Sequence, residues 1–271
     1  MKNLIILSLI LANFNLAYSL DIQSLNVDLQ ELQFKGDKGN GLVRSLEVEM
    51  NEKNMLASPA YPIQIIKTGS VIKIKTLGIT MTWNDIPSWL QGSVDLDLTN
   101  TQIYLGIAND HSFKLETLNL NQPELGSVTI RGIEATCQNS LRRRPLIKQL
   151  PQDCLKKANI KASELNIPML NNFLSAILVN QSTPQVANNI LVDVEDNKYQ
   201  LSLNPSIVLG PGVYSYGEVE EFDDVKKTIK LRIDSVKFGY LPITPIVFKE
   251  LKKRLPPEKF KVERPYIYIN F

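Results

Sequence analysis

Apolar and polar residues alternate with a period of two along most of this chain, which is the pattern of strands with one buried and one solvated face. The clearest alternating segments are residues 25–29, 46–50, 72–74, 94–98, 103–107, 128–130, 229–233 and 266–271. Strands of parallel sheets bury both faces and have continuous apolar runs instead. The alternation therefore predicts an antiparallel sheet.

Two segments depart from this alternation and predict helices. In residues 168–179, apolar side chains recur at helical spacing. They are Leu170, Phe173, Leu174, Ile177 and Leu178. No charged residue occurs from 165 through 192, so we expect this helix either to be core or to line an apolar cavity. A second helix is predicted for residues 244–255, with an apolar side formed by Val247, Phe248, Leu251 and Leu255.

The first residues predict export. Lys2 precedes an apolar run over residues 4–12, and Ala17 and Ser19 are the small residues that signal peptidase requires, so residues 1–19 are expected to be a signal peptide. The alternative, a membrane anchor, needs about 20 consecutive apolar residues. We expect a periplasmic or secreted protein. Because no linker-like stretch interrupts residues 20–271, we expect them to form a single β-rich domain.

Export affects the interpretation of the two cysteines. An oxidising compartment favours pairing, so Cys137 and Cys154 are predicted to form a disulfide, with two reduced, buried thiols as the alternative. The loop between them contains a basic run of Arg142, Arg143 and Arg144. We expect this run to contact anionic headgroups or a partner, or to serve solubility alone.

Composition limits the chemistry. Thirty Lys and Arg residues against 28 Asp and Glu residues give a net charge of +2, too balanced for a general nucleic-acid binder. One histidine and two cysteines offer no catalytic set and no metal site. We therefore expect no enzyme, no cofactor and no nucleic-acid partner.

The order of elements in the second half of the chain resembles the tubular lipid-binding (TULIP) superfamily and related bacterial envelope lipid-binding domains. The residues that carry the resemblance are the strand 229–238, the sequence 239–243 (Gly-Tyr-Leu-Pro-Ile), the helix that ends at Leu255 and the closing strand 262–271. The uncharged helix 168–179 would be the second helix. The resemblance implies an α+β fold, in which a strongly curved antiparallel β-sheet wraps around long helices and leaves an elongated apolar groove.

The resemblance also implies an exported lipid-binding or lipid-transfer protein that holds a lipid or another long apolar ligand, with transient membrane contact. The residues expected to touch the acyl chain are Leu170, Phe173, Leu174, Ile177, Leu178, Val247, Phe248 and Leu251. Two alternatives stay open. One is a non-catalytic interaction or structural protein of the envelope with a filled core. The other is an outer-membrane β-barrel, suggested by Phe271 with Ile269 and Ile267 at alternate positions before it.

Overall fold

The structure is a computed structural model of the 271-residue chain. It describes residues 22–50, 53–57, 60–76, 79–84, 94–106, 110–122, 126–139, 146–168, 186–206, 211–223, 228–255, 257 and 259–270. The expected signal peptide, residues 1–19, lies outside this part. Contacts divide the chain into two compact units, Met1–Cys154 (unit 1) and Leu155–Phe271 (unit 2), and each is described by itself. The single domain expected for residues 20–271 stays a prediction.

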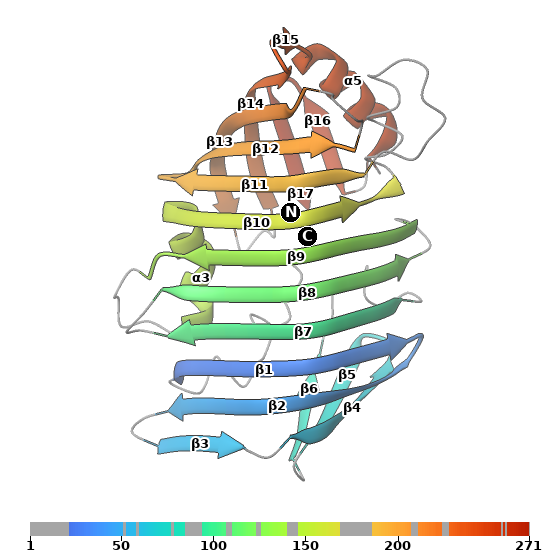
Figure 1. The fold of residues 1–271 in the computed structure, drawn as a ribbon, viewed down its shortest axis with the longest axis vertical. Helices are drawn as coiled ribbons and strands as arrows, with labels where there is room; N and C mark the ends of the chain where they lie inside the picture. The colour runs from blue at the N-terminus through green and yellow to red at the C-terminus, as the bar shows by residue number, and fades with distance from the viewer. Residues whose placement is uncertain are drawn as a thin grey trace. The chain divides into compact units, whose positions relative to one another are not determined.

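Within the described residues, unit 1 has nine antiparallel strands. They are β1 (Ile22–Lys35), β2 (Lys38–Met50), β3 (Lys53–Ala57), β4 (Tyr61–Thr68), β5 (Val71–Thr76), β6 (Ile79–Trp83), β7 (Asp95–Gly106), β8 (His111–Gln122) and β9 (Gly126–Cys137). β1 pairs with β2 and β7, and β8 and β9 follow β7 in order (Figure 1). The second half of β2 pairs with β3 and its first half with β4, which continues into β5 and β6.

The alternation of β7 changes phase inside the strand. Leu98 and Ile103 are both buried although they are five positions apart, which would place them on opposite faces of a regular strand. Asn100 lies between them with a φ of 46°, a left-handed conformation that asparagine tolerates better than most residues. The irregularity at Asn100 therefore returns the apolar side chains after it to the buried face.

A short helix covers part of the apolar face of unit 1. The helix α3 (Leu146–Lys156) follows β9. Its Leu150 is buried in a cluster with Ile103 and Leu105 of β7, and its Cys154 lies at the edge of that cluster. α3 thus contributes its apolar side to the core of unit 1.

Unit 2 is also built of antiparallel strands. Its strands are β10 (Lys157–Asn166), β11 (Ala187–Glu195), β12 (Lys198–Pro205), β13 (Val213–Asp223), β14 (Thr228–Phe238), β15 (Leu241–Pro242), β16 (Phe260–Glu263) and β17 (Tyr266–Asn270). β10 to β14 pair in order of sequence, β14 also pairs with β15 and β17, and β17 pairs with β16. The closing strand predicted over 262–271 is instead the hairpin β16–β17, because the turn at Arg264 and Pro265 interrupts it.

The core of unit 2 lies between this sheet and the helix α5 (Thr244–Arg254). Val247 and Phe248 of α5 are buried together with residues from β11 to β14, β16 and β17. Tyr199 of β12 is also buried, and its hydroxyl lies 3.3 Å from the hydroxyl of Ser215. Burial raises the pKa of Tyr199 because the phenolate would lose its hydration.

The predicted fold class is wrong. An α+β fold with long helices inside a wrapped sheet was expected, but the structure is nearly all β. In the part of the chain that is described, the helices α3 and α5 have 11 residues each. The prediction failed because alternation shows that one face of a strand is buried without showing what buries it. β-strands and an antiparallel arrangement are confirmed.

Among the described helices, none is long and apolar enough to cross a membrane.

Candidate functional site

The residues predicted to touch an acyl chain divide into two groups. Five lie outside the described residues, namely Leu170, Phe173, Leu174, Ile177 and Leu178. The other three are on α5. Val247 and Phe248 are buried in the core of unit 2, and Leu251 is half-buried against the same cluster. These three side chains therefore hold α5 on its sheet.

The predicted disulfide is confirmed. The Sγ atoms of Cys137 and Cys154 are 2.08 Å apart, and the bond joins the end of β9 to α3. The basic run of Arg142, Arg143 and Arg144 between the two cysteines lies outside the described residues.

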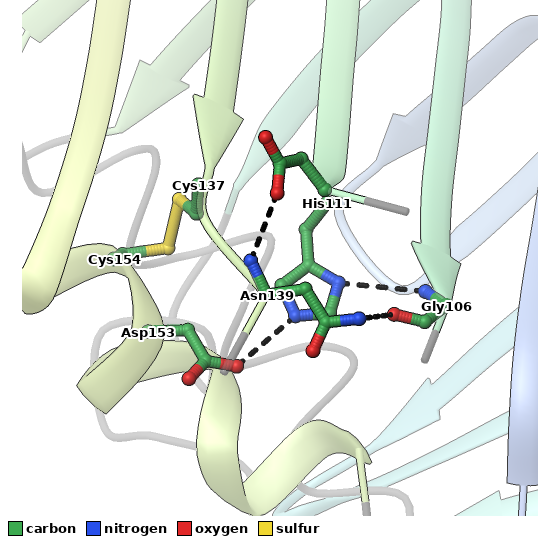
Figure 2. Close-up of a disulfide and its surroundings, with 7 residues drawn as sticks. Gly106, His111, Cys137, Asn139, Asp153 and Cys154 are labelled. Carbon is green, nitrogen blue, oxygen red and sulfur yellow. Dashed lines mark hydrogen bonds and ion pairs between the residues drawn. A yellow bond between two sulfur atoms is a disulfide. The ribbon is translucent and has the colours of Figure 1, made fainter. Parts of the chain in front are cut away.

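A buried histidine–aspartate pair lies beside the disulfide (Figure 2). His111 is directly opposite Cys137 in the β8–β9 ladder, and Asp153 precedes Cys154 on α3. The Nε2 of His111 is 3.2 Å from Oδ2 of Asp153, and both residues are only 3% exposed. The backbone N–H of Gly106 donates to Nδ1 of the same ring at 3.4 Å. Because Nδ1 accepts, the ring proton of the neutral imidazole lies on Nε2 and is donated to the carboxylate.

Asn139 completes this cluster. Its side-chain amide donates to the backbone oxygen of Gly106 at 2.7 Å, and its backbone N–H donates to Oδ1 of Asp110 at 3.1 Å. The ends of β7, β8 and β9 and the helix α3 are thus joined by polar contacts as well as by the disulfide. The buried contact between His111 and Asp153 therefore ties α3 to the start of β8. His111 is the first residue of β8.

Within the described residues, the two most exposed large apolar side chains, Tyr240 and Leu241, lie together at one end of unit 2. Tyr240 is 101% exposed, Leu241 is 66% exposed, and Ile246 at the start of α5 is 47% exposed. Pro242 and Pro245 are also exposed. We call residues 240–246 the apolar tip. Figure 1 shows it where β15 leads from the end of β14 into α5.

The apolar tip is held from behind by hydrogen bonds and by the core. Val236 is at the centre of this support: its N–H donates to the hydroxyl of Thr244 at 2.8 Å, and its carbonyl accepts from the N–H of Ile243 at 2.9 Å. Gly239 turns the chain with a φ of 58°, and its N–H donates to the carbonyl of Gly212 at 2.8 Å. Ile243 itself is buried. Tyr240 and Leu241 therefore lie on a hairpin that hydrogen bonds hold in place, and this hairpin keeps their side chains exposed to solvent.

Two exposed lysines, Lys237 and Lys249, flank the apolar tip. Residues 235–249 include two lysines and no carboxylate. Lys237 lies opposite Pro242 in the β14–β15 ladder, and Lys249 is exposed on α5. Ile246, Lys249 and Lys253 follow one face of that helix at three- and four-residue spacing, and all three are exposed. The apolar tip is thus flanked by lysines on β14 and on α5.

Away from the tip, the solvated face of unit 2 has an ion-pair network. Arg232 contacts Glu218 at 2.8 Å, Glu220 at 3.1 Å and Asp234 at 2.8 Å. Lys230 contacts Glu220 at 2.6 Å, and this hydrogen bond lowers the pKa of the Glu220 carboxyl and raises the pKa of Lys230. Two basic side chains meet three carboxylates here, in contrast to the tip.

Sequence analysis missed both the apolar tip and the partner of His111. It used residues 240–242 only as part of the resemblance to the lipid-binding superfamily. The available signal was three apolar residues directly after the turn-forming Gly239, where polar residues are the norm. No local signal links His111 to Asp153, because 42 residues separate them.

Within the described residues, no three His, Cys, Asp or Glu side chains are grouped closely enough to hold a metal ion. Comparisons of the chain with protein-family models, curated proteins and solved structures find no match.

Proposed function

We propose that this protein binds the surface of an anionic lipid membrane through the apolar tip of unit 2, without catalysing a reaction. The observation that carries the proposal is the full exposure of Tyr240 on a fixed hairpin beside Leu241 and Ile246. Large apolar side chains that gather at one exposed place mark an interaction site more often than isolated ones do.

The composition of the tip favours a lipid surface as the partner. Tyrosine has an apolar ring and a polar hydroxyl, which suits the boundary between headgroups and acyl chains. Leu241 and Ile246 would enter the acyl region, while Lys237 and Lys249 would reach anionic headgroups. Residues 235–249 contain no carboxylate, and Asp234 and Glu250 border this stretch.

The expected affinity is modest. Burying a leucine or isoleucine side chain contributes about 1.5–3 kcal/mol, and a lysine close to an anionic surface contributes about 1 kcal/mol. Leu241 and Ile246 are already partly covered, so the lower figure applies to each. Two such side chains and two lysines give about 5 kcal/mol, which corresponds to a Kd on the order of 0.1–1 mM. Binding would be reversible and superficial.

The disulfide supports a location outside the reducing cytosol, because such bonds persist in oxidising compartments. We therefore propose an exported protein, periplasmic or secreted, that acts at a membrane surface.

Vesicle binding tests the proposal. Wild-type protein is expected to float with vesicles that contain an anionic phospholipid such as phosphatidylglycerol and to bind phosphatidylcholine vesicles at least fivefold less. Leu241→Asp places a charge where the acyl region would be and is expected to reduce binding to anionic vesicles at least tenfold.

Leu191→Asp is the matched control, because Leu191 is also an exposed leucine of unit 2 but lies on β11, away from β15. It is expected to bind within twofold of wild type. The proposal fails if wild-type protein ignores anionic vesicles, or if the two variants lose binding equally.

A further inference from the structure

Tyr214 of β13 lies on the solvated face of unit 2, in a cross-strand row that leads to the apolar tip. Tyr214 is opposite Lys237 of β14, and Lys237 is opposite Pro242 of β15. Neighbours in such a row are about 4.5–5.5 Å apart. Tyr214 is 50% exposed, and Lys237 and Pro242 are exposed as well. The exposed surface of the tip therefore continues across β14 as far as Tyr214.

The side chain of Tyr214 leans along β13 toward the end of the strand that adjoins the tip. A β-carbon placed on Gly212 would be 3.1 Å from the hydroxyl oxygen of Tyr214 and 3.2 Å from its Cζ, so the ring extends over Gly212. The carbonyl of Gly212 accepts a hydrogen bond from the N–H of Gly239, the residue directly before Tyr240. The hydroxyl of Tyr214 therefore lies at the same end of the sheet as Tyr240.

The character of this face changes just beyond Tyr214. Tyr216 is two residues farther along β13 and is 46% exposed. The next outward position is Glu218, which contacts Arg232 at 2.8 Å. An anionic membrane would repel this carboxylate, and the ion pair would lose hydration if a membrane covered it. The part of the face that suits an anionic lipid surface therefore ends between Tyr214 and Glu218.

Given the membrane binding proposed above, on which this inference rests, we propose that the anionic membrane also contacts the sheet face beside the tip, as far as Tyr214. The tip enters the acyl region, and the hydroxyl of Tyr214 lies in the headgroup layer. Tyrosine suits that layer, because its ring is apolar and its hydroxyl stays hydrated. Lys237 lies between Tyr214 and the tip, so its ammonium reaches the same headgroups. Tyr214 is thus at the edge of the membrane contact, and Tyr216 stays in water.

The two exposed tyrosines of β13 provide a matched test by flotation with phosphatidylglycerol vesicles. Tyr214→Ser is expected to weaken binding at least fivefold, because it removes an aromatic ring from the membrane interface. Tyr216→Ser removes the same group from the same face of the same strand and is expected to bind within twofold of wild type. Tyr214→Phe keeps the ring and is expected to bind within threefold. Circular dichroism checks that each variant is folded.

A nitroxide label measures the depth of each position directly. Both cysteines of the chain form the disulfide, so a single introduced cysteine is the only thiol to label. The variants Leu241→Cys, Tyr214→Cys and Tyr216→Cys are labelled and bound to the same vesicles. Their accessibility is then measured to oxygen, which concentrates in the acyl region, and to a nickel complex, which stays in water. Position 241 is expected in the acyl region, position 214 in the headgroup layer and position 216 in water.

Equal binding by Tyr214→Ser and Tyr216→Ser would overturn this inference, as would a label at position 214 that is as accessible to the nickel complex as the label at position 216. Weaker binding of Tyr214→Ser together with a label in water at position 214 would also overturn it, because the ring would then act on the fold of the hairpin. In each of these cases membrane binding itself stands, since wild-type protein still floats and Leu241→Asp still loses binding. Wild-type protein that ignores anionic vesicles overturns both.

Discussion

At the scale of single residues, the pair of His111 and Asp153 shows how one side chain determines the cost of burying another. A buried imidazole N–H that has lost its acceptor keeps the full penalty of its lost hydration. Here the acceptor is supplied by α3, and the disulfide beside it holds α3 in place. The two contacts therefore stabilise the same junction of helix and sheet.

This dependence predicts that Asp153→Ala lowers the free energy of unfolding by about 1–3 kcal/mol, because Nε2–H of His111 is left buried without an acceptor. The measurement is urea unfolding monitored by circular dichroism. The double variant His111→Phe, Asp153→Ala is expected to lose less free energy of unfolding than the two single variants lose together.

Glu134→Ala serves as the surface control. Its side chain is 59% exposed and contacts Lys114 at 3.6 Å, so a change of less than about 0.5 kcal/mol is expected. Strictly additive losses at His111 and Asp153 would contradict the coupling between them.

At the scale of elements, α3 depends on its attachment. Isolated helices shorter than about 12–15 residues are marginal in water, and α3 has 11. Its described apolar contacts centre on Leu150 against Ile103 and Leu105. The disulfide joins two residues that are 17 positions apart. It therefore limits how far residues 146–156 can move away from Cys137 in the unfolded chain.

Removal of the disulfide is therefore expected to destabilise the protein by about 3 kcal/mol, as for loops of similar length. The variant Cys137→Ser with Cys154→Ser is compared with wild type by urea unfolding, and hydrogen exchange follows α3 directly. Dithiothreitol is expected to reproduce the loss in wild type and to change nothing further in the double variant. Unaltered exchange of residues 146–156 in that variant would show that α3 is held by packing alone.

At the scale of the whole molecule, net charge and local charge differ. A net charge of +2 gives little long-range attraction to an anionic membrane, whereas the lysines beside the apolar tip act at short range. Salt screens exposed charges and leaves the burial of apolar side chains almost untouched.

Raising the salt concentration from 50 to 500 mM is accordingly expected to weaken the binding of anionic vesicles by three- to tenfold without abolishing it. The double variant Lys237→Gln, Lys249→Gln is expected to bind anionic vesicles more weakly than wild type at 50 mM salt. Its affinity is expected to change less than twofold between 50 and 500 mM salt. Flotation at several salt concentrations measures both. Complete loss of wild-type binding at 500 mM would show that Leu241 and Ile246 do not enter the lipid.

Sequence alone determined the features that depend on local geometry or on counting. Strand 229–238 and helix 244–255 were predicted within a residue, because side-chain periodicity follows from the backbone of each element. The disulfide followed from two cysteines and one possible pairing. The closing strand was predicted without its turn, although Pro265 lacks the N–H that a continuous ladder needs.

Tertiary structure decided what the apolar faces meet and which residues stay in solvent. Periodicity could not show that Val247 and Phe248 fill a core, since a core and a lipid channel are lined by the same residue types. It could not show that Tyr240 is exposed, because exposure depends on where β14 and α5 place the hairpin between them. It could not bring Tyr214 beside Lys237, because that neighbourhood exists only after β13 and β14 pair. Such contacts join residues far apart in the chain, and only the folded sheet sets them.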